Sequence, residues 1–330
     1  MKKDKFPLRY RTIKFIKARV GEIQRKRKTA EKPGGIANKI SDALEIALTR
    51  AVIATLKKDF GDIVEEYAKK EENANTDTDG VIWICWLQGE ESAPPLIKRC
   101  IESIRTNAKN HKVVLIDRHN VHEYIDLPDY IIQKYEQKLM IPAHLSDIIR
   151  MCLLAKYGGL WIDSSMFCAY EIGEDIWNMP LYTSRGYYKS PLPNTNEREK
   201  EESGCAMLWL IGVMGGKKGH PFFCFARDMK LQYWKKYSTP MTYLMLDCIL
   251  RLAYNTIGIA KRDIDAIPRN AKSWLYLWDI FHTAYDKEKI AALTCDGTLF
   301  FKIGWRESYE MYTKAGEETV YKRFLDGTLS

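Results

Sequence analysis

The sequence lacks several features that would assign it to a familiar class. No run approaches the roughly 18 to 20 uninterrupted apolar residues of a membrane-spanning helix, and the N-terminus lacks the short apolar segment and cleavage site of a signal peptide. The eight cysteines are widely spaced without a C-x-x-C pair, which indicates reduced core residues rather than disulfides or a zinc site. We therefore expect a cytoplasmic protein.

A phosphate-binding glycine loop is also missing, because the glycines before Lys217 have neither the required spacing nor a following Ser or Thr. There is no internal repeat. The chain has 330 residues, of which 46% are hydrophobic and 12% aromatic, and this composition excludes a disordered protein. It predicts a globular chain of one large domain or two ordinary ones.

The excess of positive charge is confined to one end of the chain. Residues 1–32 contain thirteen Lys or Arg and three Asp or Glu, a balance of +10, whereas the whole chain carries +8, so the other 298 residues carry −2. Ile13, Ile16, Val20 and Ile23 recur at helical spacing, which favours a helix lying on an anionic membrane surface. A solvated basic tail, or a nucleic-acid arm using residues 25–28, remains an alternative.

The distribution of charge and the pattern of hydrophobic residues predict three parts. These are a basic arm at 1–35, a helical segment and linker at 36–80, and a catalytic domain at 81–330. The pattern from Ile36 to Lys70 predicts one further helix, followed by an exposed linker from Glu71 to Gly80.

From residue 81 onward, β-rich runs alternate with amphipathic helices, which predicts an α/β fold with a mostly parallel sheet flanked by helices. The expected strands lie at 81–87, 112–117, 160–163, 207–214 and 300–305, and the expected helices at 94–109, 129–139, 144–157, 221–237 and 241–254.

The most informative stretch is S-D-x-x-R at 146–150, followed by G-G-x-W-x-D at 158–163. Asp147 and Arg150 share a helix face, and the Gly-Gly turn leads into a short strand that ends at Asp163. Open α/β sheets bind ligands at such strand ends. Two carboxylates and an arginine suit sugar hydroxyls, or a divalent metal holding a diphosphate. On spacing alone, a surface ion pair and a turn cap explain these residues equally well.

This pair of motifs resembles the capsular polysaccharide synthesis family of DXD-type glycosyltransferases. That family has a GT-A fold and is similar to glycosyltransferase family 32 and the large clostridial glucosylating toxins. The segments at 82–89, 94–104, 113–117 and 124–128 fit in the same order, so the resemblance covers residues 81–306. The function it implies is hexosyl transfer from a nucleotide sugar, with UDP-hexose as the expected donor.

The resemblance also implies the donor-binding residues. Trp83 or Trp86 would lie beside the base, and Asp147, Arg150 and Asp163 would hold the donor sugar and serve as the catalytic residues. The motif K-I-G-W-R at 302–306 resembles a loop that closes over the diphosphate, with Trp305 as a lid and Lys302 or Arg306 as a phosphate partner.

The metal site departs from the family pattern. A complete D-x-D would have a carboxylate at position 165, where this chain has Ser165. The resemblance implies Mn²⁺ or Mg²⁺ at Asp163 and Ser165, but the serine removes one formal charge and weakens such a site. D-x-[ST] also occurs within the family, so activity is expected to persist.

The expected acceptor is a glycan or a lipid-linked saccharide of a bacterial surface or capsular polysaccharide, and the expected product is an α-linkage formed with retention. The basic arm would then hold the enzyme at the inner face of the plasma membrane, without binding nucleic acid. Tyr243 and Asp247, four apart in a predicted helix, could face the acceptor, although a helix-surface pair is the simpler interpretation. The alternatives are another nucleotide-sugar enzyme, such as a phosphosugar transferase, and a non-catalytic nucleic-acid-binding protein.

Overall fold

A computed structural model of the chain describes residues 4–27, 36–71, 77, 80–185, 209–293 and 295–329. Within them, a central sheet of five strands has the order β2-β1-β3-β6-β5. Strand β1 runs parallel to β2 and β3, whereas β6 runs antiparallel to β3 and β5. The predicted α/β class with a mostly parallel sheet is therefore confirmed. The strand bounds are β1 (Ile82–Cys85), β2 (Val113–Ile116), β3 (Gly159–Ile162), β5 (Leu181–Ser184) and β6 (Leu210–Gly216).

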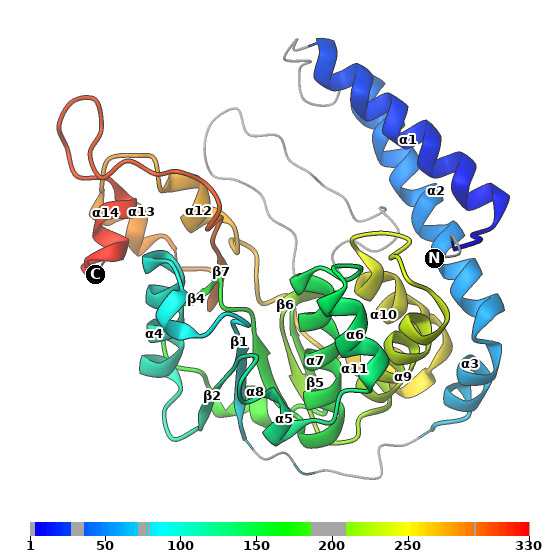
Figure 1. Ribbon diagram of the computed structural model, residues 1–330. Coiled ribbons are helices and arrows are strands. Elements are labelled where there is room, and N and C mark those ends of the chain that lie inside the picture. Colours follow the sequence, from blue (N-terminus) through cyan, green and yellow to red (C-terminus); the bar gives the residue numbers. More distant parts are fainter. Residues whose placement is uncertain are drawn as a thin grey trace.

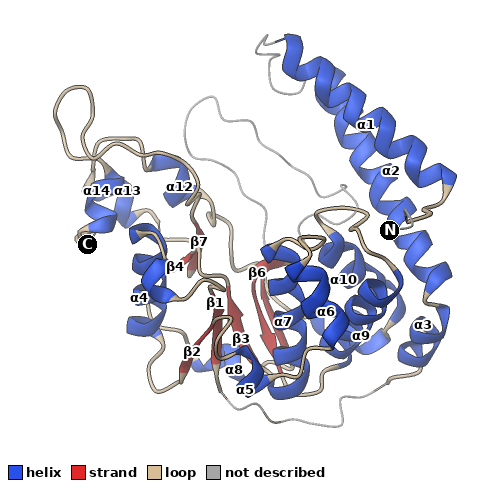
Figure 2. Cartoon of the chain, in the orientation of Figure 1, coloured by secondary structure: helices blue, strands red, loops and turns tan. Residues whose placement is uncertain are grey.

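Each face of the sheet is covered by its own hydrophobic core. In β1, Trp83 and Cys85 belong to one core, while Ile82 and Ile84 belong to the other, because successive strand side chains point to opposite faces. Figure 2 shows the strands lying between two groups of helices. The sheet is thus buried on both sides, as its apolar strands require.

The first face is covered by helices of the middle of the chain: α5 (Val121–Tyr124), α6 (Asp129–Glu136), α7 (Pro142–Tyr157), α9 (Pro221–Lys236), α10 (Met245–Thr256) and α11 (Gly258–Asp265). The second face is covered by α4 (Pro95–Asn107), α8 (Glu174–Asn178), α12 (Tyr276–Ile280), α13 (Lys287–Ala291) and α14 (Val320–Leu325), while the short helix η1 (Glu90–Ser92) precedes α4 and has no buried residue. Beside this second core, β4 (Met166–Cys168) pairs antiparallel with β7 (Phe300–Lys302), which brings the C-terminal part of the chain to the end of β3.

The N-terminal helices α1 (Leu8–Arg27) and α2 (Ile36–Asp59) lie side by side, and α3 (Gly61–Ala68) continues onto the body (Figure 1). The prediction of a single helix over 36–70 is wrong, because the chain breaks between α2 and α3 at Phe60. Most of the linker predicted at 71–80 lies outside the described residues. Leu48, Val52 and Leu56 of α2 are buried in the first core, so this extension packs on the domain.

The basic arm begins with firm contacts to the body. The carboxylate of Asp4 accepts hydrogen bonds from the backbone N–H groups of Ser238 and Thr239, at 2.9 and 2.8 Å. Tyr10 is buried, and its hydroxyl donates to the backbone carbonyl of Met241. The start of the arm is therefore a docked helix rather than a solvated tail.

The apolar stripe predicted for a membrane serves partly to pack α1 on its neighbours. Ile13 is half-buried against the first core, and Lys17 forms an ion pair with Glu45 of α2. Leu8 and Phe15 point outward instead, with exposed fractions of 70% and 62%. In the part of the chain that the structure describes, no helix has the length and apolar character needed to cross a bilayer.

Candidate active site

A double-glycine turn positions the site by joining α7 to β3. Gly158 and Gly159 have φ angles of 68° and 88°, a backbone region that favours glycine. A Cβ atom on Gly158 would lie 2.6 Å from the carbonyl oxygen of Gly216, and one on Gly159 would lie 2.3 Å from that of Val81. Only glycine therefore lets the chain pass between β1 and β6 and return from α7 straight into the strand that ends at Asp163.

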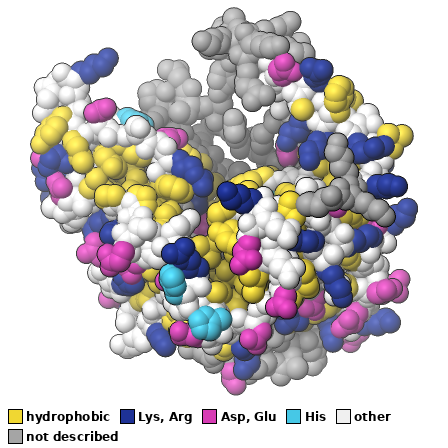
Figure 3. Space-filling model, in the orientation of Figure 1, with side chains coloured by type: hydrophobic (Ala, Val, Ile, Leu, Met, Phe, Trp, Pro, Cys, Tyr) yellow, Lys and Arg dark blue, Asp and Glu magenta, His cyan; other side chains and the backbone are white. Residues whose placement is uncertain are grey.

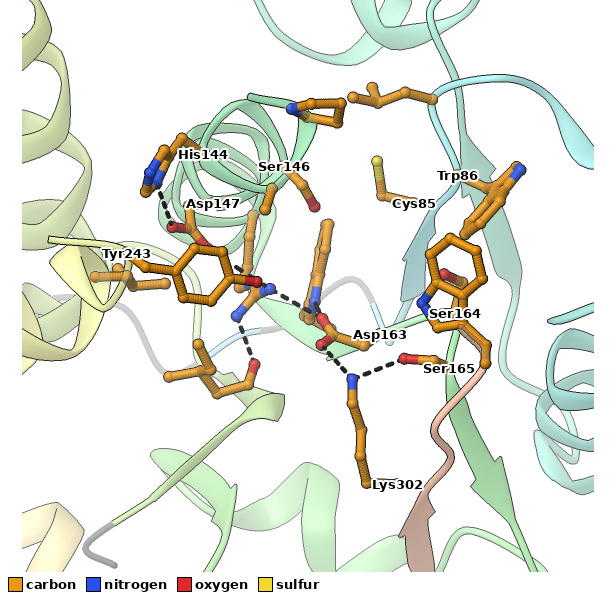
Figure 4. A pocket seen from close by; sticks show the side chains of 18 of the residues that line it. Cys85, Trp86, His144, Ser146, Asp147, Asp163, Ser164, Ser165, Tyr243 and Lys302 are labelled. Atoms are coloured by element: carbon orange, nitrogen blue, oxygen red, sulfur yellow. Dashed lines mark hydrogen bonds and ion pairs between the residues drawn. The ribbon is translucent and has the colours of Figure 1, made fainter. Parts of the chain in front are cut away.

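This turn brings the three motif residues Asp147, Arg150 and Asp163 together, and Figure 4 shows Asp147 and Asp163 beside the same cavity. Arg150 donates to Oδ1 of Asp163 at 2.9 Å and lies 3.8 Å from Oδ1 of Asp147. Its other terminal nitrogen donates to the carbonyl oxygen of Ile211 at 2.6 Å. The indole of Trp161 also donates to Oδ1 of Asp163, at 2.8 Å, so the tryptophan of the motif orients the carboxylate. The structure thus excludes the alternative of a surface ion pair, since Asp147 and Arg150 are both buried.

Lys230 completes this network and was missed by the sequence analysis. Its ammonium group is fully buried and donates to Oδ2 of Asp147 at 2.8 Å, while Nδ1 of His144 lies 3.9 Å from the same oxygen. Burial opposes ionisation of Asp147, but Lys230, His144 and Arg150 outweigh it and lower its pKa to about 2. A signal did exist, because a lysine at 230 interrupts the buried apolar face of α9.

Asp163 is held as a carboxylate in the same way. Its burial opposes ionisation, yet the positive charges of Arg150 and Lys302 keep its pKa below the ordinary value. Both carboxylates of the motif are therefore ionised at neutral pH and are already bound to cations.

Above this network lies a cavity of about 300 Å³ at the C-terminal end of β1 and β3. Its walls come from the ends of β1 and β3, the start of α7, the segment before α10 and the segment after β7. They include Trp86, His144, Ser146, Asp147, Arg150, Asp163, Ser165, Tyr243, Asp247, Lys302, Trp305 and Arg306. Every predicted site residue except Trp83 lines it.

Trp83 lies in the first core instead. It is 2% exposed, its indole donates to the carbonyl oxygen of Gly158 at 3.0 Å, and it packs against Tyr124 and Tyr157. Of the two tryptophans considered for the base, Trp83 does not line the cavity, because it lies two residues before Cys85, the residue at the end of β1 that borders it. Trp86, just after β1, lines the cavity.

The end of β7 and the segment after it supply cationic and aromatic groups to the opposite wall. The ring of Trp305 meets that of Trp86 edge to face at 5.3 Å, and the guanidinium of Arg306 lies 4.4 Å from the Trp305 ring centre. The ammonium of Lys302 donates to Oγ of Ser165 at 2.7 Å and lies 3.4 Å from Oδ2 of Asp163. Two aromatic rings and two cations thus border one side of the cavity.

Tyr243 and Asp247, read from the sequence as a helix-surface pair, both line the cavity. Tyr243 precedes α10 rather than lying on it, is 65% exposed and points into the cavity in Figure 4. Asp247 lies in the first turn of α10. Burial and the charge of Asp147 raise the pKa of Asp247 to about 6.

The oxygens expected to hold a divalent metal are bound to protein cations. Oδ1 of Asp163 accepts from Arg150 and Trp161, and the Lys302 ammonium lies against both Oδ2 of Asp163 and Oγ of Ser165. Among the described residues, no group of three or more His, Cys, Asp or Glu side chains could hold a metal. As arranged, one carboxylate oxygen and one hydroxyl around an ammonium do not fit a divalent cation.

The chemistry of the cavity suits a ligand with three kinds of group. The Trp86–Trp305 pair offers aromatic surface, Lys302 and Arg306 offer positive charge for an anion, and the ionised aspartates accept hydrogen bonds from hydroxyls. Lys302 is the last residue of β7, and Trp305 and Arg306 follow it closely in the chain, so one stretch of the chain supplies the indole and both cations.

Comparison with known proteins identifies relatives of the chain. Residues 36–324 match the family described as capsular polysaccharide synthesis protein. The chain is 26% identical over 159 residues to the O-glycosyltransferase braB of Annulohypoxylon truncatum, covering 44% of this chain and 35% of that protein. It is 25% identical over 146 residues to the uncharacterized glycosyltransferase L373 of Acanthamoeba polyphaga mimivirus, covering 43% and 51%.

These matches span about a third to a half of the length of the curated relatives. Among solved structures, the chain is similar to the PaToxG glycosyltransferase, with 16% identity and a TM-score of 0.38 over 66% of this chain and 83% of that chain.

Proposed function

Because the chain belongs to the capsular polysaccharide synthesis protein family, we propose that it is a glycosyltransferase that moves a hexose from a nucleotide sugar, UDP-hexose foremost, to a glycan. One observation carries the proposal: the motif residues Asp147, Arg150 and Asp163 converge beneath a cavity whose other wall holds Lys302, Trp305 and Arg306. The family match at 36–324 includes these residues, and their convergence at one cavity adds a geometric argument to it.

In this proposal the donor lies across the cavity. The base packs beside Trp86, the diphosphate meets Lys302 and Arg306, and the sugar hydroxyls bind the aspartates of the network. Arg150, held between Asp147 and Asp163, fixes both carboxylates before the donor arrives. Such preorganised charges act without the cost of reorientation when the bond breaks.

The reaction breaks the bond between the anomeric carbon and the diphosphate oxygen, and the electron pair stays on the leaving diphosphate. The acceptor hydroxyl oxygen forms the new bond to the same carbon, and its proton passes to a diphosphate oxygen. We propose attack from the face that the diphosphate leaves, which retains configuration and gives an α-linkage. Lys302 and Arg306 stabilise the added negative charge, and the Trp305 ring excludes water from the cavity.

Incubation of the full chain with a panel of UDP- and GDP-hexoses, with detection of the nucleotide released, tests this function. A glycosyltransferase releases a nucleoside diphosphate, whereas a phosphosugar transferase releases the monophosphate. Arg306→Ala should lower donor turnover about tenfold or more, since a charge-assisted contact to the diphosphate is lost. The matched control Lys261→Ala removes an exposed lysine on α11, outside the cavity, and should leave turnover unchanged. Failure of every donor to bind or turn over contradicts the proposal.

We also propose that the outer face of α1 holds the enzyme on an anionic membrane that carries a lipid-linked saccharide acceptor, such as a bacterial capsule precursor on the inner face of the plasma membrane. Leu8 and Phe15 are exposed there among Arg9, Arg11 and Arg19. Figure 3 shows Lys and Arg side chains along the α1–α2 hairpin. Apolar side chains within a basic helix face are the features that bind such surfaces.

Vesicle sedimentation tests the membrane proposal better than removal of residues 1–32, because removal would also break the contacts of Asp4 and Tyr10 with the body. The variant Leu8→Ser with Phe15→Ser should remain folded and lose most of its binding to vesicles containing phosphatidylglycerol. Binding of the wild type should fall as salt rises. Equal binding of wild type and variant, or preference for DNA over vesicles, would refute this role.

A further inference from the structure

The strongest unexplained feature of the site is the position of Lys302 on the two oxygens that a D-x-D motif would offer to a metal. Its ammonium is 2.7 Å from Oγ of Ser165 and 3.4 Å from Oδ2 of Asp163. The position at which the motif loses a carboxylate is thus the position at which the structure supplies a cation. Compared with a complete D-x-D motif that holds a divalent cation, the site has one negative charge fewer and one positive charge fewer, so its net charge is the same.

Lys302 is held there by the backbone on both sides. It pairs with Met166 in the ladder between β4 and β7, and its N–H donates to the carbonyl oxygen of Trp274 at 2.8 Å. The next residue, Ile303, donates its N–H to the carbonyl oxygen of Ser165 at 2.9 Å. The lysine therefore starts from a fixed point directly beside Ser165, and only its side chain can move.

The balance of charges in the site also disfavours a bound divalent metal ion. Arg150, Lys230, Lys302 and Arg306 are in the cavity wall or directly beneath it, against the carboxylates of Asp147, Asp163 and Asp247. Each oxygen of Asp163 already accepts a hydrogen bond from a protein donor. A divalent ion on Oδ2 of Asp163 would have to displace the Lys302 ammonium or lie close to it, with mutual repulsion.

We propose that Lys302 takes the place of the divalent metal in this protein, so that nucleoside diphosphates bind, and leave, without a metal ion. This inference rests on the proposed function and defines its cofactor requirement. In the ligand-free site the ammonium is held by Ser165 and Asp163; with donor bound it contacts the diphosphate from the same position. Serine suits this role because a second carboxylate at position 165 would bind the ammonium more strongly and compete with the phosphates.

Isothermal titration of the full chain with UDP and with GDP, in EDTA and in Mn²⁺, tests the inference without any turnover. The wild type should bind one of them in EDTA, with an affinity that Mn²⁺ changes by less than about twofold. Lys302→Met keeps the aliphatic stem and should weaken binding about tenfold or more in EDTA, because a charge-assisted contact is lost. Lys302→Arg should retain part of the affinity.

The converse variant rebuilds the metal site. Ser165→Asp combined with Lys302→Ala should lose metal-free binding and regain affinity about tenfold or more when Mn²⁺ is added, because two carboxylates then replace one carboxylate and an ammonium. The control Lys289→Ala removes a lysine on α13 that lies outside the cavity, and it should behave as wild type in both buffers. Thermal unfolding of each variant checks that the fold is retained.

Wild-type binding of UDP or GDP that requires Mn²⁺ would overturn the inference and leave the proposed function standing. Unchanged affinity of Lys302→Met in EDTA would overturn it as well. A chain that binds neither nucleotide in either buffer would contradict the proposed function itself, and the inference with it.

Discussion

Two regions of the cavity differ in how they are built. The floor, formed by Asp147, Arg150, Asp163 and Lys230, is a closed network in which Lys230 is 0% and Arg150 4% exposed. The rim, formed by Trp86, Tyr243, Trp305 and Arg306, is half-buried or exposed. Tyr243 and Arg306 come from segments that lie outside helices and strands.

The difference has an energetic meaning. The charged side chains of the floor neutralise one another, so removing one of them leaves an uncompensated buried charge. The side chains of the rim do not take part in such buried ion pairs. Removing one of them therefore changes ligand binding in the cavity rather than the stability of the fold. Substitutions in the floor should therefore lower the free energy of unfolding, whereas substitutions in the rim should lower ligand affinity.

The largest effect is expected for Asp147→Ala. It leaves the fully buried ammonium of Lys230 without its 2.8 Å partner, and breaking a buried pair in this way costs about 3 to 5 kcal/mol of unfolding free energy. Urea denaturation measures this loss. Activity would disappear as well, but the stability loss means that activity alone cannot assign Asp147 a role in the reaction.

The double variant Asp147→Asn with Lys230→Met separates charge from packing. It removes both buried charges and keeps the approximate volumes, so it should recover much of the stability that Asp147→Ala loses. If Asp147→Ala is as stable as the wild type, the floor is not a closed network and the contrast with the rim fails.

A smaller effect, on affinity alone, is expected for Trp305→Ala. The Trp305 ring contacts that of Trp86 edge to face at 5.3 Å and supports Arg306. In the proposed arrangement the base packs beside Trp86, and stacking of a base on an aromatic side chain contributes about 1 to 3 kcal/mol in proteins that bind single-stranded nucleic acid. Because the Trp305 ring supports Trp86, its loss should lower donor affinity roughly tenfold. Calorimetric titration measures this change, and urea denaturation should show no loss of stability beyond about 1 kcal/mol. If Trp305→Ala lost as much stability as Asp147→Ala, the rim would contribute to the fold as the floor does, and the contrast between the two regions would be wrong.

The same contrast explains what the sequence could predict. Asp147, Arg150 and Asp163 are close in the chain and joined by a double-glycine turn, so their convergence follows from local geometry. The α/β class followed equally from the alternation of strands and helices. These predictions needed no knowledge of long-range pairing.

Residues that reach the site through tertiary packing were harder to predict. Lys230 is on α9, and only its place within an apolar helix face sets it apart. Tyr243 was placed on a helix that begins at Met245, which hid its position at the rim. The arm was read from its charge, but its docking depends on Asp4 and Tyr10, whose partners lie more than two hundred residues away. Charge counts carry no information about such contacts.

A further prediction concerns the pH dependence of stability and Asp247, which lines the cavity. Burial and Asp147 raise its pKa from 3.8 to about 6, so the folded state binds the proton more tightly than the unfolded state. Stability from this group therefore falls as pH rises from about 4 to about 6. Asp247→Asn should be about 1 to 2 kcal/mol more stable than the wild type at pH 7, with no difference below pH 4.

The pKa of Asp147 is shifted in the opposite direction, so its effect on stability changes with pH in the opposite sense. Its pKa is lowered from 3.8 to about 2, so its contribution is present above pH 4 and is lost as pH falls toward 2. Urea denaturation from pH 3 to pH 7 should therefore show that Asp247→Asn flattens the profile between pH 4 and 6 and keeps the loss at lower pH. A variant that is less stable than the wild type at pH 7 would mean that the ionised Asp247 is bound by a cation, as the floor carboxylates are, and Asp247 would then belong to the floor.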